Sequence, residues 1–200
     1  MPSPARVKYR VSVSNAETLR NNVRRTRGKF TTHERKVQYA ACLAAHVAAW
    51  ETYLENLVKD FLAAVADPLD SRYTALADLF IPKVEVELKK FNTPKYDNSR
   101  TLIYTSTGYD PINDWNWSQR NMGGPAVKNL VDEIVTVRHH FAHGAPMRAY
   151  SWNTGRTGQP RLTDDCLDLV RGLFGHLVRV TDVHVSSHAC ATYRISKLWY

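Results

Sequence analysis

The chain contains 200 residues, of which 44% are hydrophobic and 23% are charged, and this composition is typical of a folded domain and excludes a disordered chain. No stretch approaches the roughly 20 uninterrupted apolar residues of a membrane-spanning helix, and Met1–Arg6 lacks an apolar signal core, so we expect a cytoplasmic protein with no membrane partner. Three cysteines, each among helix-forming apolar neighbours, fit buried thiols in a reducing compartment better than a disulfide framework.

Positive charge is concentrated at the N-terminus. Residues 1–30 contain eight Lys and Arg residues and a single acidic residue, so they carry nearly all of the formal net charge of +8. We interpret them as a loosely packed basic N-terminal arm that precedes a helical domain at residues 31–200. Such an arm attracts RNA or an acidic membrane face by counterion release and electrostatic steering; a solvated tail without a partner is the alternative. The side chains expected to contact RNA here are Arg24, Arg25, Arg27 and Lys29.

From Thr31 onward the pattern is that of a long amphipathic helix. Thr31 and Glu34 have the spacing of a capping box, and apolar residues recur at steps of three and four from Ala40 to Val65. Pro68 cannot continue the helix, which should therefore end just before it. At ~1.5 Å per residue the helix would span about 50 Å. Because this exceeds the width of a compact domain of this size, we expect the helix to bend or to protrude.

Two shorter helical segments are expected next. The first runs from about Arg72 to Phe80, and Pro82 then opens the stretch Lys83–Leu88. That stretch alternates apolar and polar residues with the period of a strand, but it lies in helical surroundings and we predict a helix there.

A further helix is predicted over Pro94–Ser106. Thr93 would cap it, proline would take the first helical position, and Gly108 would end it. The stretch Tyr109–Gly124 contains turn-forming residues and tryptophans but no sustained period, so we predict an ordered loop.

The helix that carries the candidate site begins at Pro125. Its apolar residues have the spacing of a buried stripe, and Gly144 together with Pro146 ends it. After a second loop a last helix begins at Thr163, with acidic residues in the first turn that suit the helix dipole, and its pattern fades after about Thr181. All predicted elements are helices, so we expect an all-α fold.

Three histidines and an arginine crowd the last two turns of the helix that begins at Pro125. On an ideal helix His139 and His143 lie one above the other, and His140 is close to His143. Arg138 lies about 140° around the axis from His143, at ~100° per residue. The arginine and the last histidine therefore do not share a face of one straight helix. Either a loosened last turn or a symmetric dimer would bring them together.

The chemistry of these side chains suits RNA cleavage. The 2′-hydroxyl of RNA is a built-in nucleophile that needs a base, an acid and a cation near the phosphate. Imidazole titrates near neutral pH, and a guanidinium binds phosphate oxygens in a bidentate manner. His140 is expected to contribute to RNA binding. The structural alternative is that basic residues in a last helical turn only stabilise the helix dipole.

A zinc site is a competing interpretation. His139 and His143 have the spacing of zinc-binding helices, but no glutamate lies between them where a metalloprotease keeps its base. His184, His188 and Cys190 offer a second such spacing, for which packed or surface histidines are the simpler explanation. We expect neither a metal nor another cofactor.

The stretch Leu130–Gly144 resembles the signature helix of HEPN domains, in which an arginine is followed, after four to six residues, by a histidine. Here four residues separate Arg138 from His143. A polar residue directly after the arginine and the ending Ala-His-Gly are similar to the RiboL-PSP-HEPN type. Further stretches similar to that family, which extend the resemblance over roughly residues 35–180, are Ala48–Glu55, Phe91–Pro94, Asn98 and Trp115.

The resemblance implies a HEPN-like helical bundle with a long N-terminal core helix that dimerises through the signature helix. Both protomers would then contribute to a composite, metal-independent RNA-cleaving site. Arg138 and His143 would be the catalytic pair and His139 would assist. The implied protein is an endoribonuclease, a toxin or antiviral effector, with RNA as substrate and a protein antitoxin as partner.

A catalytically silent dimeric module that binds RNA or a protein is the alternative, because some members of the superfamily have lost activity. Both hallmark residues, Arg138 and His143, are present here, which favours the enzyme. Glu51 is a candidate supporting group, although a solvated helix residue is the simpler interpretation. Residues 1–30 lie outside the resemblance, so the role of this segment rests on its charge alone.

Overall fold

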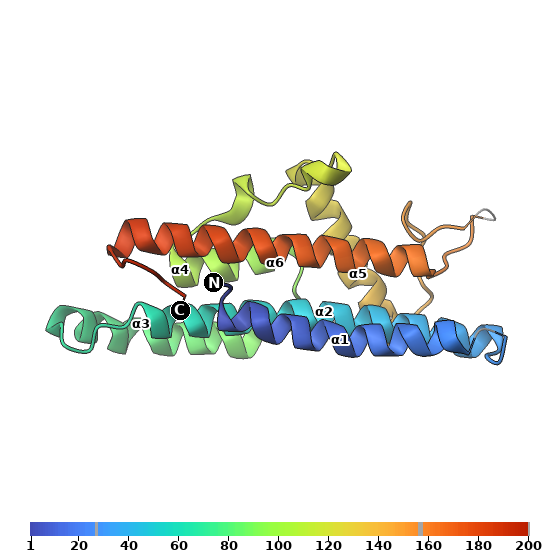
Figure 1. The fold of residues 1–200 in the computed structure, drawn as a ribbon, viewed down its shortest axis with the longest axis horizontal. Helices are drawn as coiled ribbons and strands as arrows, with labels where there is room; N and C mark the ends of the chain where they lie inside the picture. The colour runs from blue at the N-terminus through green and yellow to red at the C-terminus, as the bar shows by residue number, and fades with distance from the viewer. Residues whose placement is uncertain (27, 156–157, 200) are drawn as a thin grey trace.

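The computed structural model describes residues 1–26, 28–155 and 158–199, and within these ranges every regular element is a helix, which confirms the predicted all-α fold (Figure 1). None of these helices combines the length and apolar character needed to cross a membrane. The elements are α1 (Pro4–Arg25), α2 (Thr32–Ala64), α3 (Ser71–Lys90), α4 (Tyr96–Thr107), the short 3-10 helices η1 (Pro111–Asn113) and η2 (Ser118–Arg120), α5 (Gly124–Ala142) and α6 (Asp164–Tyr193).

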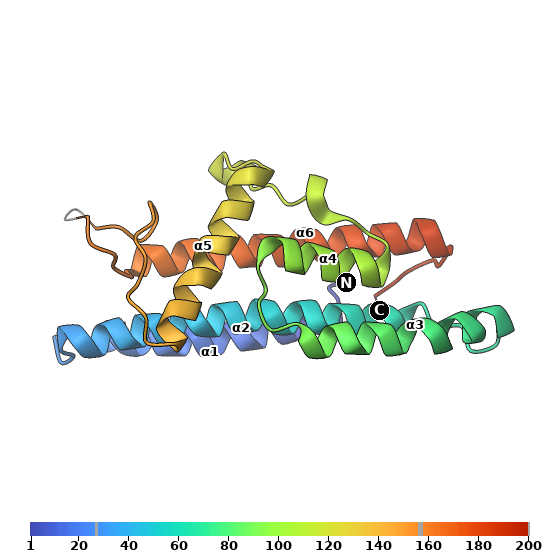
Figure 2. The same ribbon diagram turned by 180° about the vertical axis from the view of Figure 1, so that it is seen from behind.

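The long helix predicted after Thr31 is α2. The Thr31 hydroxyl accepts the N–H of Glu34, and the Glu34 carboxylate accepts the N–H of Thr31, so the predicted capping box is present. The helix runs along an elongated molecule, in which α1 lies beside its first part and α3 turns back beside its end (Figures 1 and 2). Helices α1, α4, α5 and α6 pack along α2, so the expected bend is not needed, whereas α3 packs only loosely beside its end and leaves Leu76 and Leu79 exposed.

The N-terminal segment is not the loosely packed arm that its composition suggests. Ser3 caps α1 with its hydroxyl, and Pro4 lies in the first turn. The helix packs against α2. Its buried residues follow helical spacing, but two of them are alanines and one is an arginine, so the apolar signal in the sequence is weak. They are Ala5, Tyr9, Ala16, Arg20 and Val23.

Trp50 of α2 lies at the centre of the core. Its buried ring stacks on Tyr53 and on Phe174 of α6, with centroid distances of 5.8 and 5.6 Å, and meets Trp115 edge-on at 5.8 Å. Trp115 donates its indole N–H to the hydroxyl of Thr181 at 2.8 Å. The segment between α4 and α5 is thus anchored in the core, as expected of an ordered loop.

Helix α3 is continuous through Pro82, so the predicted break after Phe80 is wrong, whereas the helix predicted over Lys83–Leu88 is confirmed. Proline lacks an N–H and leaves the carbonyl four residues earlier without its helical partner. That carbonyl belongs to Asp78, an exposed residue, so water can satisfy it. The cost of the proline is therefore smaller here than inside a buried helix.

Helix α6 continues to Tyr193, well beyond the predicted end near Thr181, and the two ends of the chain meet on it (Figure 1). The backbone N–H of Ser3 donates to the Asp182 carboxylate at 3.1 Å, and the Ser3 hydroxyl bonds to the same group. The Trp199 indole donates to the carbonyl of Asp182 at 3.4 Å. Asp182 is buried, and these bonds compensate its desolvation.

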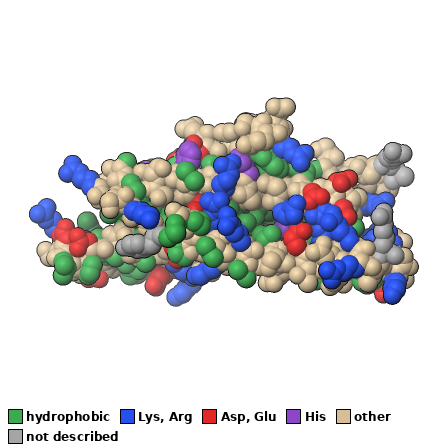
Figure 3. All heavy atoms as spheres, in the orientation of Figure 1, with side chains coloured by type: hydrophobic (Ala, Val, Ile, Leu, Met, Phe, Trp, Pro, Cys, Tyr) green, Lys and Arg blue, Asp and Glu red, His purple; other side chains and the backbone are tan. Residues whose placement is uncertain are grey.

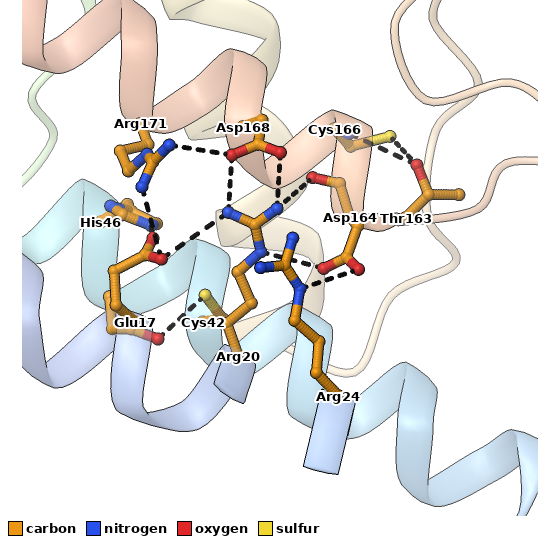
Figure 4. A network of polar contacts seen from close by, with 11 residues as sticks. Glu17, Arg20, Arg24, Cys42, His46, Thr163, Asp164, Cys166, Asp168 and Arg171 are labelled. Atoms are coloured by element: carbon orange, nitrogen blue, oxygen red, sulfur yellow. Dashed lines mark hydrogen bonds and ion pairs between the residues drawn. The ribbon is translucent and has the colours of Figure 1, made fainter. Parts of the chain in front are cut away.

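Arg20 of α1 is only 1% exposed and joins α1 to α6 through a network of ion pairs (Figure 4). Its guanidinium donates to both carboxylate oxygens of Asp168 at 2.6 Å and to Asp164 at 2.9 Å. Glu17 lies 3.6 Å from Arg20 and 3.5 Å from Arg171. The hydrogen bonds from Arg20 hold the pKa of Asp168 below its usual value. A buried guanidinium is tolerated only with such partners, so this network fixes how α1 lies on α6.

We expect Arg20→Met to destabilise the fold strongly, because it keeps the aliphatic length but leaves Asp164 and Asp168 without their shared cation. Removing one side of a buried ion pair costs about 3–5 kcal/mol; the two carboxylates are partly exposed and screened by water, so we expect about 2–3 kcal/mol. Urea unfolding followed by circular dichroism measures this loss. Arg25→Met, on the same helix but exposed, should stay within ~0.5 kcal/mol of wild type. Equal losses in the two variants would contradict the role given to Arg20.

Candidate active site

Helix α5 positions the arginine and the histidines. It spans Gly124–Ala142 with Pro125 in its first turn, within one residue of the prediction. One face packs against α2 and α4, and Figure 2 shows the helix crossing α2 obliquely. This packing fixes the helix and leaves its last turn at the surface. The buried stripe consists of Val127, Leu130, Val131, Ile134, Val135 and Val137.

The chain leaves α5 through a Schellman motif. Gly144 has a φ of 67°, a left-handed conformation that favours glycine. The N–H of Ala145 donates to the carbonyl of His140 at 2.8 Å, and the N–H of Gly144 donates to that of Phe141 at 3.3 Å. These bonds satisfy carbonyls that the helix end leaves open and make the end of α5 a defined structure.

The α-helix ends at Ala142, and the N–H of the next residue, His143, still donates to the carbonyl of His139 at 3.1 Å, as in a helix. Arg138 therefore keeps its position about 140° around the axis from His143. The loosened last turn, one of two ways to bring Arg138 and His143 together, is not present. The other way, pairing of two chains, stays a prediction.

His139 and His143 lie close together, as their spacing predicts. Their ring centroids are 4.2 Å apart with an angle of 47° between the planes, and both residues are exposed. Partial desolvation, together with the nearby positive charges of His143, His140 and Arg138, lowers the pKa of His139. This shift favours the neutral form of His139, in which an imidazole accepts a proton.

Arg138 is half-buried and lies near Glu51 of α2. Burial raises the pKa of the Glu51 carboxyl, while the charge of the Arg138 guanidinium opposes this shift and Glu55 adds to it. Glu51 is thus close enough to the end of α5 to feel the charge of Arg138, although the two side chains form no ion pair.

His140 is tied to the loop that follows α5. Its Nδ1 lies 2.8 Å from the carbonyl oxygen of Pro146. A carbonyl only accepts, so Nδ1 carries the hydrogen and Nε2 is left as an acceptor. One nitrogen of this expected RNA contact is therefore engaged within the protein.

The N-terminus of α4 lies beside the histidines. Asp132, two turns before His139, accepts the N–H of Tyr96 at 2.9 Å and thereby caps α4, so the predicted cap at Thr93 is wrong. Lys95 is exposed, and its charge is among those that lower the pKa of His139. Lys95 was not among the predicted site residues, because its position near α5 depends on a contact between segments that are distant in the sequence.

The basic residues near the end of α1 lie on a different element from the histidines. Arg24 donates to Asp164 at 3.1 Å, so part of its charge is used within the protein. Arg25 and Lys29 are exposed, and Arg27 lies outside the described residues. The structure thus gathers the residues of the signature helix, while the four N-terminal RNA contacts stay a prediction.

The second group of histidines is held by packing and hydrogen bonding. His184 Nδ1 lies 3.1 Å from a carboxylate oxygen of Asp114, and the ring of His188 lies 5.9 Å from that of Tyr109. In the part of the chain that the structure describes, no three His, Cys, Asp or Glu side chains come together as a metal ion requires.

The profile of the RiboL-PSP-HEPN family matches residues 14–178. The chain belongs to the RiboL-PSP-HEPN family. The match confirms the resemblance and extends it: it begins inside α1, although we placed the start near residue 35. No curated protein and no solved structure matches the chain. Membership in this family points to an RNase-type or RNA-related function.

The charge of His143 is one of the causes that lower the pKa of His139. Replacing His143 by alanine removes a positive charge close to His139, so the pKa of His139 should rise toward the usual histidine value. Titration of the imidazole resonances by NMR measures this change. His33→Ala, at an exposed position on α2, is the control and should leave His139 unaffected. A pKa of His139 that falls or stays constant in the His143 variant would contradict the coupling.

Proposed function

We propose that this RiboL-PSP-HEPN protein is a metal-independent endoribonuclease whose active site forms between two chains. The observation that carries the proposal is the regular end of α5, which holds Arg138 and His143 on different faces of one rigid helix. Two such helix ends related by a two-fold axis place the arginine of one chain opposite the histidine of the other.

The surface around the helix end supports pairing of two chains. Phe141 is 40% exposed between the histidines, and Ala142 beside it is exposed as well. A large apolar side chain in the midst of basic groups gains stability when a second helix covers it. The same contact would partly dehydrate Arg138 and the imidazoles and so strengthen their interaction with a phosphate.

The proposed reaction uses the 2′-hydroxyl of the RNA as nucleophile. The 2′-oxygen bonds to the adjacent phosphorus while its proton passes to a neutral imidazole. The bond from phosphorus to the 5′-oxygen breaks, and that oxygen takes a proton from a protonated imidazole. His143 takes one of these roles and His139, whose pKa is lowered, suits the base. Arg138 stabilises the charge that develops on the phosphate oxygens.

The proposal extends to a role in the cytoplasm as a toxin or antiviral effector that stops translation by cutting RNA. The products would carry a 2′,3′-cyclic phosphate and a 5′-hydroxyl, and no cofactor is consumed. An enzyme that acts on cellular RNA must be held inactive until needed. A protein antitoxin that covers the end of α5 or prevents pairing would do so.

The purified protein should cleave RNA in the presence of excess chelator, and Arg138→Ala or His143→Ala should each reduce the rate by at least ~100-fold. Gel electrophoresis of a labelled RNA, with analysis of the new ends, measures this. Arg72→Ala and His33→Ala, both exposed and on other helices, are the matched controls and should retain full activity. RNA binding without turnover in the wild type would favour the catalytically silent module instead.

Mixing the two inactive variants tests whether the site is shared. A heterodimer of Arg138→Ala and His143→Ala chains contains one site with both substitutions and one site with neither, so the mixture should recover part of the wild-type rate. A site contained in a single chain recovers nothing. Failure of the mixture to cleave RNA, although its chains exchange, would overturn the composite site.

Induced expression of the wild-type chain in a bacterial host should arrest growth within about one generation, since cleavage of cellular RNA stops translation. Growth curves together with incorporation of a labelled amino acid measure the effect. The His143→Ala chain, produced at the same level, should leave growth unchanged. Arrest by both chains would contradict a toxic effect through RNA cleavage.

A further inference from the structure

A second polar cleft, separate from the end of α5, lies between the first turns of α6, the loop that precedes them, and η2. Its volume is about 1130 Å³, more than a typical small-ligand pocket. Three arginines from these three segments line it: Arg120, Arg161 and Arg171. On the face of the molecule shown in Figure 3, acidic and basic side chains gather over α1 and this half of α6.

The charges at the floor of the cleft are compensated within the protein. Asp168 is fully engaged by the buried Arg20, with two bonds of 2.6 Å. Arg171 lies 3.5 Å from Glu17 and 3.1 Å from Asp168, and Figure 4 shows both contacts. Asp168 and Arg171, which we call the floor of the cleft, therefore add little net charge. The sign of charge that the cleft favours in a ligand depends on the remaining charged residues, at its rim.

The rim carries Arg120, Arg161 and a single exposed carboxylate, Asp165. Among the described residues, no carboxylate lies within ion-pair distance of either arginine. Arg120 instead lies over the ring of Trp117, 5.5 Å from its centroid. Two arginines without acidic partners outweigh one carboxylate, so the rim favours an anion.

The loop holds Arg161 in a defined place. Its backbone N–H donates to the carbonyl of Asn153 at 2.6 Å, next to the bridge between Thr154 and Pro160. Asn153 is 1% exposed, and its side chain bonds to the backbone of Tyr150 and of Arg148. The position of Arg161 is therefore set by folding rather than by a ligand, as a binding site requires.

Flat groups for stacking accompany the arginines. Trp152 lines the cleft, and Trp117 packs so closely on Gly172 that an added Cβ would lie 3.1 Å from its ring. The guanidinium of Arg120, resting on Trp117, presents a further flat face. Bases of single-stranded RNA stack on aromatic rings and on guanidinium planes, while arginines bind the phosphates.

From these features we propose that the cleft binds a phosphate-bearing nucleotide unit, with its phosphate between Arg120 and Arg161. The loop that lines the cleft starts at the end of α5, where Pro146 is bonded to His140, so an RNA strand leaving the helix end can follow it to the cleft. As a site for the RNA substrate this proposal rests on the proposed ribonuclease function; as a site for a free nucleotide it does not.

The test uses a dye-labelled single-stranded oligonucleotide of about 12 nucleotides with 2′-O-methyl groups, which block the nucleophile so that binding is read without cleavage. Fluorescence anisotropy at several salt concentrations compares wild type with R120A/R161A. We expect about tenfold weaker binding, equivalent to ~1.4 kcal/mol. The slope of log K against log salt should be shallower by about 0.7, the contribution of the one phosphate held between Arg120 and Arg161 on a single strand.

A substitution of opposite sign sharpens the test. Asp165→Asn removes the exposed carboxylate and should tighten binding about two- to threefold. Arg72→Ala and Asp78→Asn, at exposed residues on α3, change the charge in the same two directions at the other end of the molecule and should leave binding unchanged. Circular dichroism confirms that each variant is folded.

Calorimetric titration with adenosine 5′-monophosphate distinguishes the two sources of the phosphate. Saturable binding of the monophosphate that R120A/R161A abolishes, with oligonucleotide binding unaffected, identifies a free nucleotide as the ligand. Weakened oligonucleotide binding with the predicted change of slope identifies the RNA strand. If R120A/R161A binds both ligands as Arg72→Ala does, the proposal is overturned. Because no arm measures cleavage, the result stands whether or not the protein is a ribonuclease.

Discussion

The burial of one long helix is the constraint on which the rest of the structure depends. Helix α2 packs against α1, α4, α5 and α6, and its Trp50 is the centre of the aromatic core. The apolar face of this 33-residue helix is stabilised by burial, at about 25 cal/mol per Å². The elongated shape of the molecule follows the length of α2, along which α1 makes the most extensive packing (Figure 1).

The ion pairs of Arg20 give this arrangement its specificity. Apolar packing alone allows α1 to slide or rotate on α2. The guanidinium of Arg20, which is bonded to two carboxylates of α6, fixes one position of α1 relative to α6. One of these carboxylates, Asp168, also lines the polar cleft, so the interaction that fixes α1 also compensates a charge of the cleft. Part of the positive charge of the N-terminal segment, on Arg20 and Arg24, is therefore used in ion pairs within the protein. Only the remaining basic side chains can contact a ligand.

At the candidate site, the important feature is that the end of α5 is held in a fixed conformation. The glycine cap keeps α5 regular up to His143, and Asp132 attaches the start of α4 beside it. Side chains on such a frame lose little entropy when they bind a phosphate, which is what a catalytic arrangement needs. The same rigidity keeps Arg138 and His143 apart within one chain. This separation is the reason why the proposed active site draws on two chains rather than on a movement within one.

The sequence by itself determined α2 with its cap, most of α4, α5 and the first part of α6, and the crowding of basic groups at the end of α5, because these depend on residues within a turn or two of each other. The break predicted at Pro82 was wrong, because the free-energy cost of a proline in a helix depends on whether the carbonyl that it leaves without a partner is exposed to water. Only the tertiary structure decided that Arg20 belongs to the core and that Lys95 lies beside the histidines. These facts depend on pairs such as Arg20 with Asp168 and Tyr96 with Asp132, which are 148 and 36 positions apart. Local sequence patterns do not identify contacts between such distant residues. From the sequence alone, the positive charge of residues 1–30 is therefore as consistent with a solvated arm as with a buried ion pair.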